Sequence, residues 1–188
     1  MRVIAGTARS LPLKCIEGLE TRPTTDRIKE TLFNMIQPDL LDCFFLDLFA
    51  GSGGIGIEAL SRGARKAVFV EQNKKACDCV RDNLVFTKLS DRAEVLYTDA
   101  LSALRRLEGR EAFDFIFLDP PYGKGLEREV LSYLEHSSLA DENTTVILEA
   151  SLHEDTDWIE DYGFTPWKIK KYKTNKHLFI GRTGESYD

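Results

Sequence analysis

The sequence predicts an α/β fold with a mostly parallel, doubly wound sheet that ends in an antiparallel hairpin. Short apolar runs alternate with amphipathic helical segments from Phe44 to Leu148. A glycine-rich stretch follows the first of these runs, and two strand-like runs near the C-terminus flank a short polar turn. Strands that alternate with helices form βαβ units, which make the sheet parallel and place helices on both of its faces.

The N-terminal segment, residues 1–21, is expected to be a short arm or hairpin, because small and β-branched residues surround Gly6 and Pro12. A helix should follow. The polar run Thr24-Thr25-Asp26 offers helix caps, and apolar residues then recur at helical spacing until Pro38.

The remaining elements follow from apolar periodicity. Buried strands are expected at 45–49, 67–70, 95–97, 113–118 and 145–148, and helices are expected to begin near Gly54, Asn73, Ala100 and Leu126. The last two runs, 165–172 and 177–181, flank Lys173-Thr174-Asn175, which suits a hairpin turn. A length of 188 residues favours a single domain over 1–188, with the catalytic core at 22–188.

The charges of the chain argue both for and against a nucleic-acid partner. A net charge of -6 argues against a nucleic-acid partner, because phosphate contacts require Lys and Arg. Both ends of the chain are nevertheless basic, although a run of charge is often only a solvated face. The candidate RNA-binding residues are Arg2, Arg9, Lys14, Lys170, Lys171 and Lys173.

The cysteines indicate neither a metal site nor a disulfide framework. Cys15, Cys43, Cys77 and Cys79 form no CxxC pair, and no His stands at ligand spacing. No apolar stretch resembles a signal peptide or approaches the roughly 18 residues of a membrane span. We therefore expect no metal, no membrane partner and a cytoplasmic location.

A glycine loop is the candidate cofactor site. Gly51-Ser52-Gly53-Gly54-Ile55-Gly56 follows a predicted strand and opens a helix, as in the fingerprint Gly-x-Gly-x-x-Gly. Glu71, at the end of the next strand, suits the hydroxyls of a ribose. These two features fit NAD and S-adenosylmethionine equally well.

Two aspartates refine this cofactor prediction. Asp47 stands before the glycines, where its charge would attract an ammonium and a sulfonium but repel a pyrophosphate. This favours S-adenosylmethionine, unless Asp47 merely caps the loop. Asp99 follows the strand at 95–97 and is placed to accept a hydrogen bond from an adenine amino group, to cap the next helix, or to do both.

Asp119-Pro120-Pro121-Tyr122 is the candidate catalytic motif, because it ends a predicted strand where ligands of open α/β sheets bind. The lone pair of an aryl amine is delocalised into its ring, and acceptors on both amine hydrogens favour a nucleophilic geometry. Asp119 can supply one acceptor and the Pro120 carbonyl the other, since the prolines stiffen the turn. Tyr122 offers a face for a flipped base. The alternative is a rigid polar turn.

The chain also resembles a known family through four stretches that occur in order. They are Arg22-Pro23-Thr24, Asp47-Leu48-Phe49-Ala50-Gly51-Ser52-Gly53, Glu58-Ala59-Leu60-Ser61-Arg62-Gly63-Ala64 and Asp119-Pro120-Pro121-Tyr122. With them the chain resembles bacterial small-subunit (16S) rRNA guanine-N2 methyltransferases over nearly its whole length. Asp-Pro-Pro-Tyr alone is shared with adenine-N6 and cytosine-N4 DNA methyltransferases. The Arg22-Pro23-Thr24 stretch and the stretch from Glu58 to Ala64 are what narrow the resemblance to the rRNA enzymes.

The resemblance implies a class I, Rossmann-like methyltransferase that uses S-adenosylmethionine. It implies that Arg22 and Thr24 close over the cofactor and that Asp119 and Tyr122 lie at the target guanine. The resemblance assigns no role to His177, and we interpret it as structural. The implied cofactor contacts are Asp47, Gly51, Gly53, Glu71 and Asp99.

The sequence therefore predicts a monomer that methylates guanine N2 in small-subunit rRNA, free or within an assembling ribosomal particle. A DNA adenine-N6 methyltransferase is an alternative, although such enzymes usually carry an extra segment that reads duplex bases. A noncatalytic nucleic-acid-binding protein is another, because fold does not imply function. An NAD-dependent oxidoreductase is the third, and Asp47 and the Pro-Pro turn argue against it.

Overall fold

The computed structural model describes residues 1–18 and 25–184. The chain forms two compact units, Met1–Ala100 and Leu101–Asp188, named unit 1 and unit 2. The predictions for Arg22 and Thr24 lie outside the described residues. Within the described parts, the predicted mostly parallel α/β fold with a C-terminal antiparallel hairpin and an N-terminal arm is confirmed.

The described residues of unit 1 form three parallel strands in the order β3-β2-β1. Helix α2 packs on β1 and β2, and α3 packs on β2 and β3, as expected for βαβ units. The elements are α1 (Asp26–Ile36), η1 (Gln37–Asp39), β1 (Phe44–Asp47), α2 (Gly54–Ser61), β2 (Lys66–Glu71), α3 (Lys74–Thr87), η2 (Ser90–Arg92) and β3 (Ala93–Tyr97).

Two helices of unit 1, α1 and α3, begin at side-chain caps. Thr25 accepts a hydrogen bond from the N–H of Ile28 at 3.2 Å, so it is the N-cap of α1. Asn73 accepts from the N–H of Ala76 at 3.1 Å at the start of α3. Both predicted helix starts are therefore confirmed by side-chain caps.

The N-terminal arm is a small hairpin held by α2. An antiparallel bridge joins Arg2 to Pro12. The Glu58 carboxylate accepts from the N–H groups of Ile4 and Ala5 at 2.9 and 3.1 Å. Gly6 has φ +85°, and a Cβ there would overlap the Ser61 carbonyl, so this close approach requires glycine.

A buried ion network completes this attachment. The Nε of Arg62 lies 2.8 Å from Glu58 Oε1, and the Nζ of Lys29 lies 3.6 Å from Glu58 Oε2. Lys29 Nζ also donates to the Arg2 carbonyl at 2.5 Å. Burial lowers the pKa of Lys29, and the Glu58 charge partly offsets that effect. The network thus connects α1, α2 and the arm through one carboxylate.

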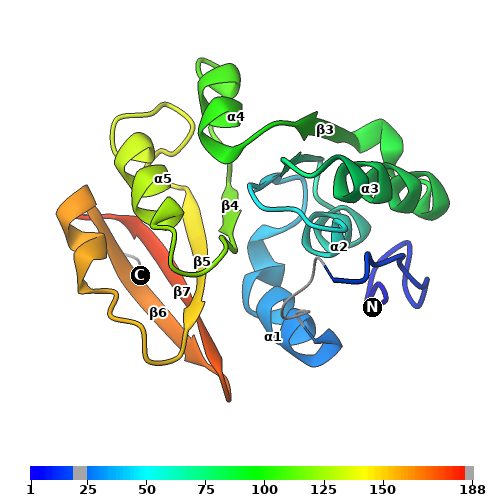
Figure 1. Cartoon of the computed structure of the whole chain (residues 1–188), viewed down its shortest axis with the longest axis horizontal. Helices are drawn as coiled ribbons and strands as arrows, with labels where there is room; N and C mark the ends of the chain where they lie inside the picture. Colours follow the sequence, from blue (N-terminus) through cyan, green and yellow to red (C-terminus); the bar gives the residue numbers. More distant parts are fainter. Residues whose placement is uncertain (19–24, 185–188) are drawn as a thin grey trace. The chain divides into compact units, whose positions relative to one another are not determined.

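Unit 2, as far as residue 184, contains four strands in the order β4-β5-β7-β6. Strands β4 and β5 are parallel, whereas β7 is antiparallel to both β5 and β6. Figure 1 shows β6 and β7 as a long hairpin in orange and red. The elements are α4 (Ala100–Leu107, which begins at the last residue of unit 1), β4 (Phe115–Leu118), α5 (Leu126–Leu134), β5 (Thr145–Ser151), η3 (Asp157–Tyr162), β6 (Phe164–Lys171) and β7 (Asn175–Arg182).

Two predicted boundaries in unit 2 were wrong. Strand β4 begins at Phe115 rather than Phe113, because the Phe113 N–H donates to the Leu139 carbonyl at 3.0 Å outside the ladder. The hairpin turn comes one residue earlier than expected. Tyr172 N–H donates to the Asn175 carbonyl at 2.8 Å, so Asn175 already belongs to β7.

Two charged side chains fasten the helices of unit 2. Arg182 donates to backbone carbonyls at the end of α5, including that of Glu135 at 2.7 Å. Glu108, after α4, accepts from Tyr133 at 2.9 Å and from the Ser137 hydroxyl at 2.6 Å. Burial alone would raise the pKa of Glu108, but hydrogen bonds from Ser137, Ser138 and Tyr133 lower it to about 2.

Replacing Glu58 with Ala should lower the free energy of unfolding by about 3–5 kcal/mol, because Lys29 and Arg62 would remain buried without their counter-charge. Urea denaturation followed by circular dichroism measures this loss. The matched control is Asp78→Ala, which breaks the exposed pairs of Asp78 with Lys74 at 2.7 Å and with Arg81 at 3.1 Å on α3 and should cost far less. Equal losses in the two variants would contradict a central role for Glu58.

Candidate functional site

The glycine loop of unit 1 combines an open backbone with tight helix packing. Gly51 and Gly53 have φ +56° and +90°, conformations that favour glycine. A Cβ on Gly51 would meet no atom within 4 Å, so its backbone is open to a ligand. A Cβ on Gly56 would overlap the Phe69 ring, so Gly56 allows α2 to pack against β2. The loop therefore has the open backbone and the close helix–strand packing that a cofactor fingerprint requires.

Glu71 holds this loop in place. Its carboxylate accepts from the N–H of Gly51 at 2.8 Å and from the N–H of Asn73 at 2.9 Å. A carboxylate has about four acceptor positions, so capacity remains for the hydroxyls of a ribose. The sequence predicted the ribose role, whereas the clamp on Gly51 is visible only in the structure.

Asn83 of α3 is a second clamp on the loop, and sequence reasoning missed it. Its amide donates to the carbonyls of Ser52 and Lys14 at 2.9 and 3.0 Å, and its oxygen accepts from the Lys14 N–H at 2.8 Å. A polar residue on the buried face of a helix was the one available signal. Asn83 joins the loop to the N-terminal arm.

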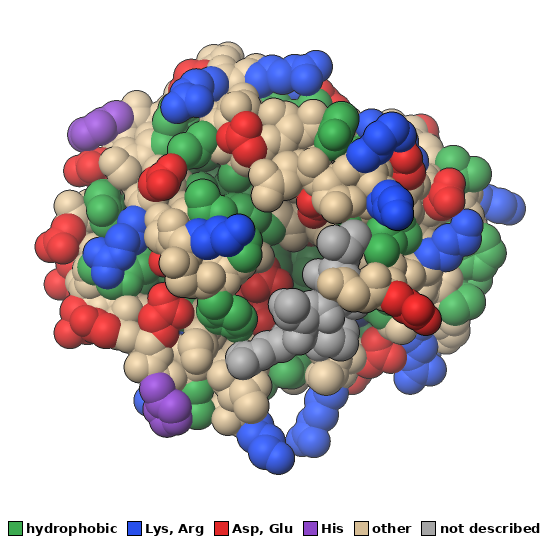
Figure 2. Space-filling view, viewed as in Figure 1, with side chains coloured by type: hydrophobic (Ala, Val, Ile, Leu, Met, Phe, Trp, Pro, Cys, Tyr) green, Lys and Arg blue, Asp and Glu red, His purple; other side chains and the backbone are tan. Residues whose placement is uncertain are grey.

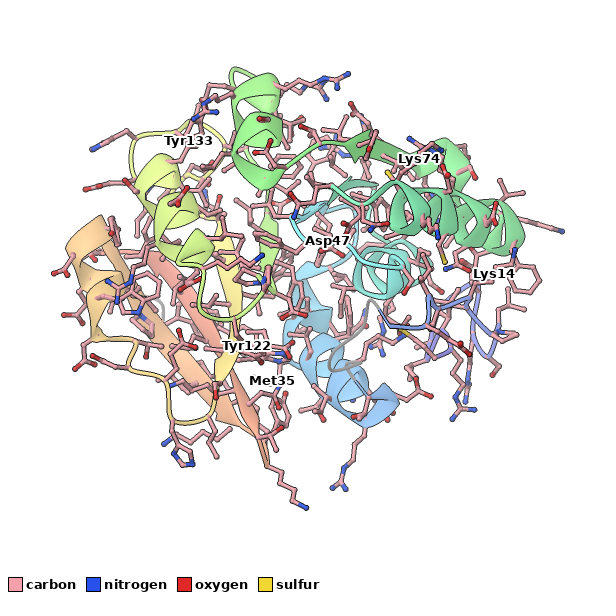
Figure 3. The ribbon with its side chains drawn as sticks, viewed as in Figure 1. Lys14, Met35, Asp47, Lys74, Tyr122 and Tyr133 are labelled. Carbon is pink, nitrogen blue, oxygen red and sulfur yellow. The ribbon has the colours of Figure 1, made fainter. Side chains whose placement is uncertain are left out.

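Asp47 is a buried carboxylate at the end of β1 (Figure 3). Only 1% of it is exposed, and neither oxygen has a hydrogen-bond partner in the described structure. Burial raises its pKa to about 7, and the Glu71 charge adds to the shift. The N–H groups of Phe49 and Gly56 counteract this in part without completing a hydrogen bond. A cationic group of a ligand would compensate the buried charge.

Asp99 extends the same edge of unit 1. It is exposed and lies between β3 and the first residue of α4. The N–H of Thr98 donates to the Glu71 carbonyl at 3.1 Å, which places the end of β3 beside the end of β2. Asp47, Glu71 and Asp99 thus follow three adjacent parallel strands, where α/β proteins bind ligands. These groups fit a cofactor that carries a cation, hydroxyls and an amino group.

The Asp119-Pro120-Pro121-Tyr122 motif follows β4 in unit 2. All four residues of β4 are buried, Asp119 is half-buried, and Pro120 is buried. Tyr122 is 43% exposed, so part of its ring is available for stacking. The motif therefore presents a carboxylate and an aromatic ring from a rigid turn.

A buried polar cluster lies on β5 and β7 of the same unit. Glu149 accepts from the Asn175 amide at 3.0 Å and bonds His177 Nε2 at 3.0 Å. Tyr172 reaches His177 Nδ1 at 3.4 Å, and burial raises the pKa of Tyr172 to about 12, with the Glu149 charge contributing. His177 is fully buried, which accords with its structural interpretation. Glu149 lies 28 residues from His177 in sequence, so no local signal indicated this contact.

The candidate RNA-binding residues differ in their surroundings. Arg2 pairs with Asp26 at 3.2 Å and Lys14 pairs with Asp82 at 3.1 Å, so acidic neighbours partly neutralise the arm. Arg9 is exposed. Lys170, Lys171 and Lys173 are exposed on and after β6.

The described residues hold no group of three or more His, Cys, Asp or Glu side chains suited to a metal ion. Cys15 is exposed, and Cys43, Cys77 and Cys79 are buried free thiols. None of the helices in the described ranges is long and apolar enough to cross a membrane.

Cofactor binding should weaken on acidification because Asp47 must be ionised to attract a cation. Since burial raises its pKa to about 7, protonation of Asp47 should lower the affinity for S-adenosylmethionine roughly 20-fold between pH 7.5 and pH 5.5. Calorimetric titration across this range measures the effect. Asp47→Asn should bind weakly and without this pH dependence, and a wild-type profile in that variant would refute the assignment.

Solved structures share this fold. A protein from Escherichia coli superposes with a TM-score of 0.86 and 30% identity over 98% of this chain and 99% of that chain. An O-methyltransferase from Bacillus cereus, solved in complex with SAH, has a TM-score of 0.67 over 87% of this chain and 84% of that chain. At 16% identity, the second likeness shows the class I methyltransferase fold alone.

Sequence comparisons identify the family. Residues 1–180 match the family described as Conserved hypothetical protein 95. The Ribosomal RNA small subunit methyltransferase D of Haemophilus influenzae is 40% identical over 152 residues, or 79% of this chain and 78% of that protein. Its Escherichia coli namesake is 40% identical over 145 residues, 76% of this chain and 71% of that protein. The chain therefore belongs to the ribosomal RNA small subunit methyltransferase D family.

Proposed function

We propose that this protein transfers a methyl group from S-adenosylmethionine to the exocyclic N2 of a guanine in small-subunit rRNA. The observation that carries the proposal is the Asp119-Pro120-Pro121-Tyr122 turn directly after β4. It is supported by membership in a family whose named relatives are small-subunit rRNA methyltransferases.

Unit 1 carries the proposed cofactor contacts. Asp47 binds the cofactor ammonium, since its buried carboxylate has no partner in the described structure. Gly51 and Gly53 allow close backbone approach, Glu71 accepts from ribose hydroxyls, and Asp99 accepts from the adenine amino group. Arg22 and Thr24 close over the cofactor, a proposal that rests on the family resemblance. The cofactor supplies an electrophilic methyl group on a positively charged sulfur.

Unit 2 carries the proposed contacts to the target base. The Asp119 carboxylate and the Pro120 carbonyl accept from the two hydrogens of the amine, which frees its lone pair for attack. As the N–C bond forms and the S–C bond breaks, the nitrogen acquires positive charge, and its proton passes to Asp119 or to water. Tyr122 stacks on the base and fixes its position.

Guanine N2 lies on the edge of the base that faces the minor groove, so an enzyme reaches it most readily on an unpaired or flipped nucleotide. Exposed loops of folded rRNA provide such nucleotides. We further propose that the protein is a monomer, that it acts on rRNA free or within an assembling particle, and that Arg2, Arg9, Lys14, Lys170, Lys171 and Lys173 contribute to RNA binding.

Incubation with labelled S-adenosylmethionine and small-subunit particles or free rRNA should yield N2-methylguanine, because the family relationship narrows an otherwise general amine chemistry. Duplex DNA, offered in parallel, should be a poor substrate. Mass spectrometry of the digested nucleosides identifies the product. Label recovered as N6-methyladenine, or in DNA only, would refute the substrate while leaving methyl transfer intact.

Asp119→Asn should lower kcat by roughly 10²–10⁴-fold, the range for a lost general acid–base group, because an amide accepts more weakly and cannot take the proton. Single-turnover methyl transfer measures this. Affinity for S-adenosylmethionine, measured by calorimetry, should change little. The control Glu142→Gln removes an exposed carboxylate from the loop before β5 and should be silent. Near wild-type turnover of Asp119→Asn would disprove the mechanism.

A further inference from the structure

Strand β6 is the edge strand of unit 2 and combines exposed aromatic, apolar and basic side chains. Trp167 is 42% exposed and Ile169 is 47% exposed. Lys168 lies between these two residues, Lys170 and Lys171 follow them, and all three lysines are exposed. No acidic residue occurs from Gly163 to Gly184, in a chain whose net charge is -6. Exposed aromatic and basic residues on one strand are typical of surfaces that bind single-stranded nucleic acid.

The register places several of these side chains on one face. Lys168 pairs with Phe179 and Lys170 pairs with His177, so both lysines project on the side of those two residues. A bulge between Pro166 and Lys168 turns Trp167 to the same side, where its ring lies 5.6 Å from that of Phe179. The sequence pattern alone would place Trp167 and Lys168 on opposite faces.

Tyr172 extends this row at the hairpin turn, since its ring lies 5.2 Å from His177 on the same side. At about 3.3 Å per residue, Trp167 and Tyr172 are about 16 Å apart along the strand. We define the β6 track as Trp167, Lys168, Lys170, Tyr172 and the exposed Lys173 beyond them. Its aromatic residues flank two lysines.

The β6 track approaches the level of the catalytic motif in unit 2. Leu118 pairs with Leu148, so Asp119 follows at the level of Glu149, which pairs with His177 and thereby lies level with Lys170. Three strand spacings of about 4.8 Å separate β4 from β6, or about 14 Å in all. An extended RNA segment of a few nucleotides can span this distance.

Charge alone does not single out an RNA surface. Lys and Arg side chains are interspersed with Asp and Glu over the face shown in Figure 2. The N-terminal candidates Arg2 and Lys14 have acidic partners. Another exposed aromatic, Phe86 of α3, shares its helix with Asp78 and Asp82. The β6 track, by contrast, joins an exposed ring to lysines within a segment free of acidic residues.

We propose that the β6 track binds the single-stranded RNA that flanks the target nucleotide, with a base stacked on Trp167 and phosphates on Lys168, Lys170 and Lys173. This inference rests on the proposed function, in which RNA is the substrate. It identifies the surface that holds the strand while Asp119 and Tyr122 engage the target base.

Intrinsic fluorescence tests the stacking directly, because the chain has two tryptophans and Trp158 is 6% exposed. The probe is a short single-stranded oligoribonucleotide of small-subunit rRNA sequence, titrated into the full chain at low salt. Trp158→Phe leaves Trp167 as the sole indole, and its emission should be quenched saturably. Trp167→Phe in the native background leaves Trp158, and the quenching should vanish.

Affinity measurements test the energetic role. Trp167→Ala should weaken binding roughly 5- to 150-fold, the equivalent of one lost base stack, and Trp167→Tyr should restore most of it. The control Phe86→Ala should bind like wild type. Replacing Lys168, Lys170 and Lys173 with Gln should reduce the slope of log affinity against log salt by about 0.7 per lost phosphate contact.

Unquenched Trp167 on RNA that is demonstrably bound, or an unchanged affinity of Trp167→Ala, would overturn the inference. These outcomes are separable from failure of the proposed function. If N2-methylguanine forms and Trp167→Ala keeps the wild-type KM for RNA, the RNA-binding role of the β6 track is refuted and the proposed methyl transfer stands. If Trp167 binds RNA but only DNA is methylated, the proposed rRNA methylation is refuted and the RNA-binding role of the β6 track stands.

Discussion

The buried carboxylate of Glu58 is the interaction on which the organisation of unit 1 depends. It accepts from two N–H groups of the N-terminal arm and pairs with Lys29 of α1 and with Arg62 at the end of α2. A buried charge is tolerated only when opposite charges and hydrogen bonds surround it, so these segments must assemble together. Because α2 begins directly after the glycine loop, this network also fixes the helix that follows the proposed cofactor contacts Gly51 and Gly53.

Two acidic residues on neighbouring strands of the proposed cofactor site differ in whether their carboxylates have hydrogen-bond partners. Glu71 is satisfied by the N–H groups of Gly51 and Asn73 and holds the loop rigid. Asp47 is buried without a partner in the described structure, which is costly for a carboxylate and raises its pKa. Unit 1 thus stabilises the shape of the loop and leaves one strong acceptor for a cationic ligand.

Unit 2 likewise combines a hydrogen-bonded interior with partly exposed side chains that suit a ligand. The Glu149–His177–Asn175 cluster and Arg182 hold β5, β7 and α5 through buried and partly buried hydrogen bonds. Tyr122 and Trp167 remain partly exposed beside this rigid body. Aromatic rings on a rigid scaffold lose little conformational entropy when a base stacks on them, so both rings suit nucleic-acid contacts.

The sequence by itself determined the features that depend on local pattern. Apolar periodicity predicted the strands, Thr25 and Asn73 marked helix starts, and the glycine loop and the turn at Asp119 indicated the proposed sites, because neighbouring residues suffice for caps, turns and periodicity. Only the tertiary structure decided which distant groups meet: Glu58 with Ile4, Asn83 with Ser52, and Glu149 with His177. It also decided that Asp47 lacks a partner in the described residues and that a bulge turns Trp167 toward Phe179. Burial and edge position depend on the packing of separate segments, which no local pattern encodes.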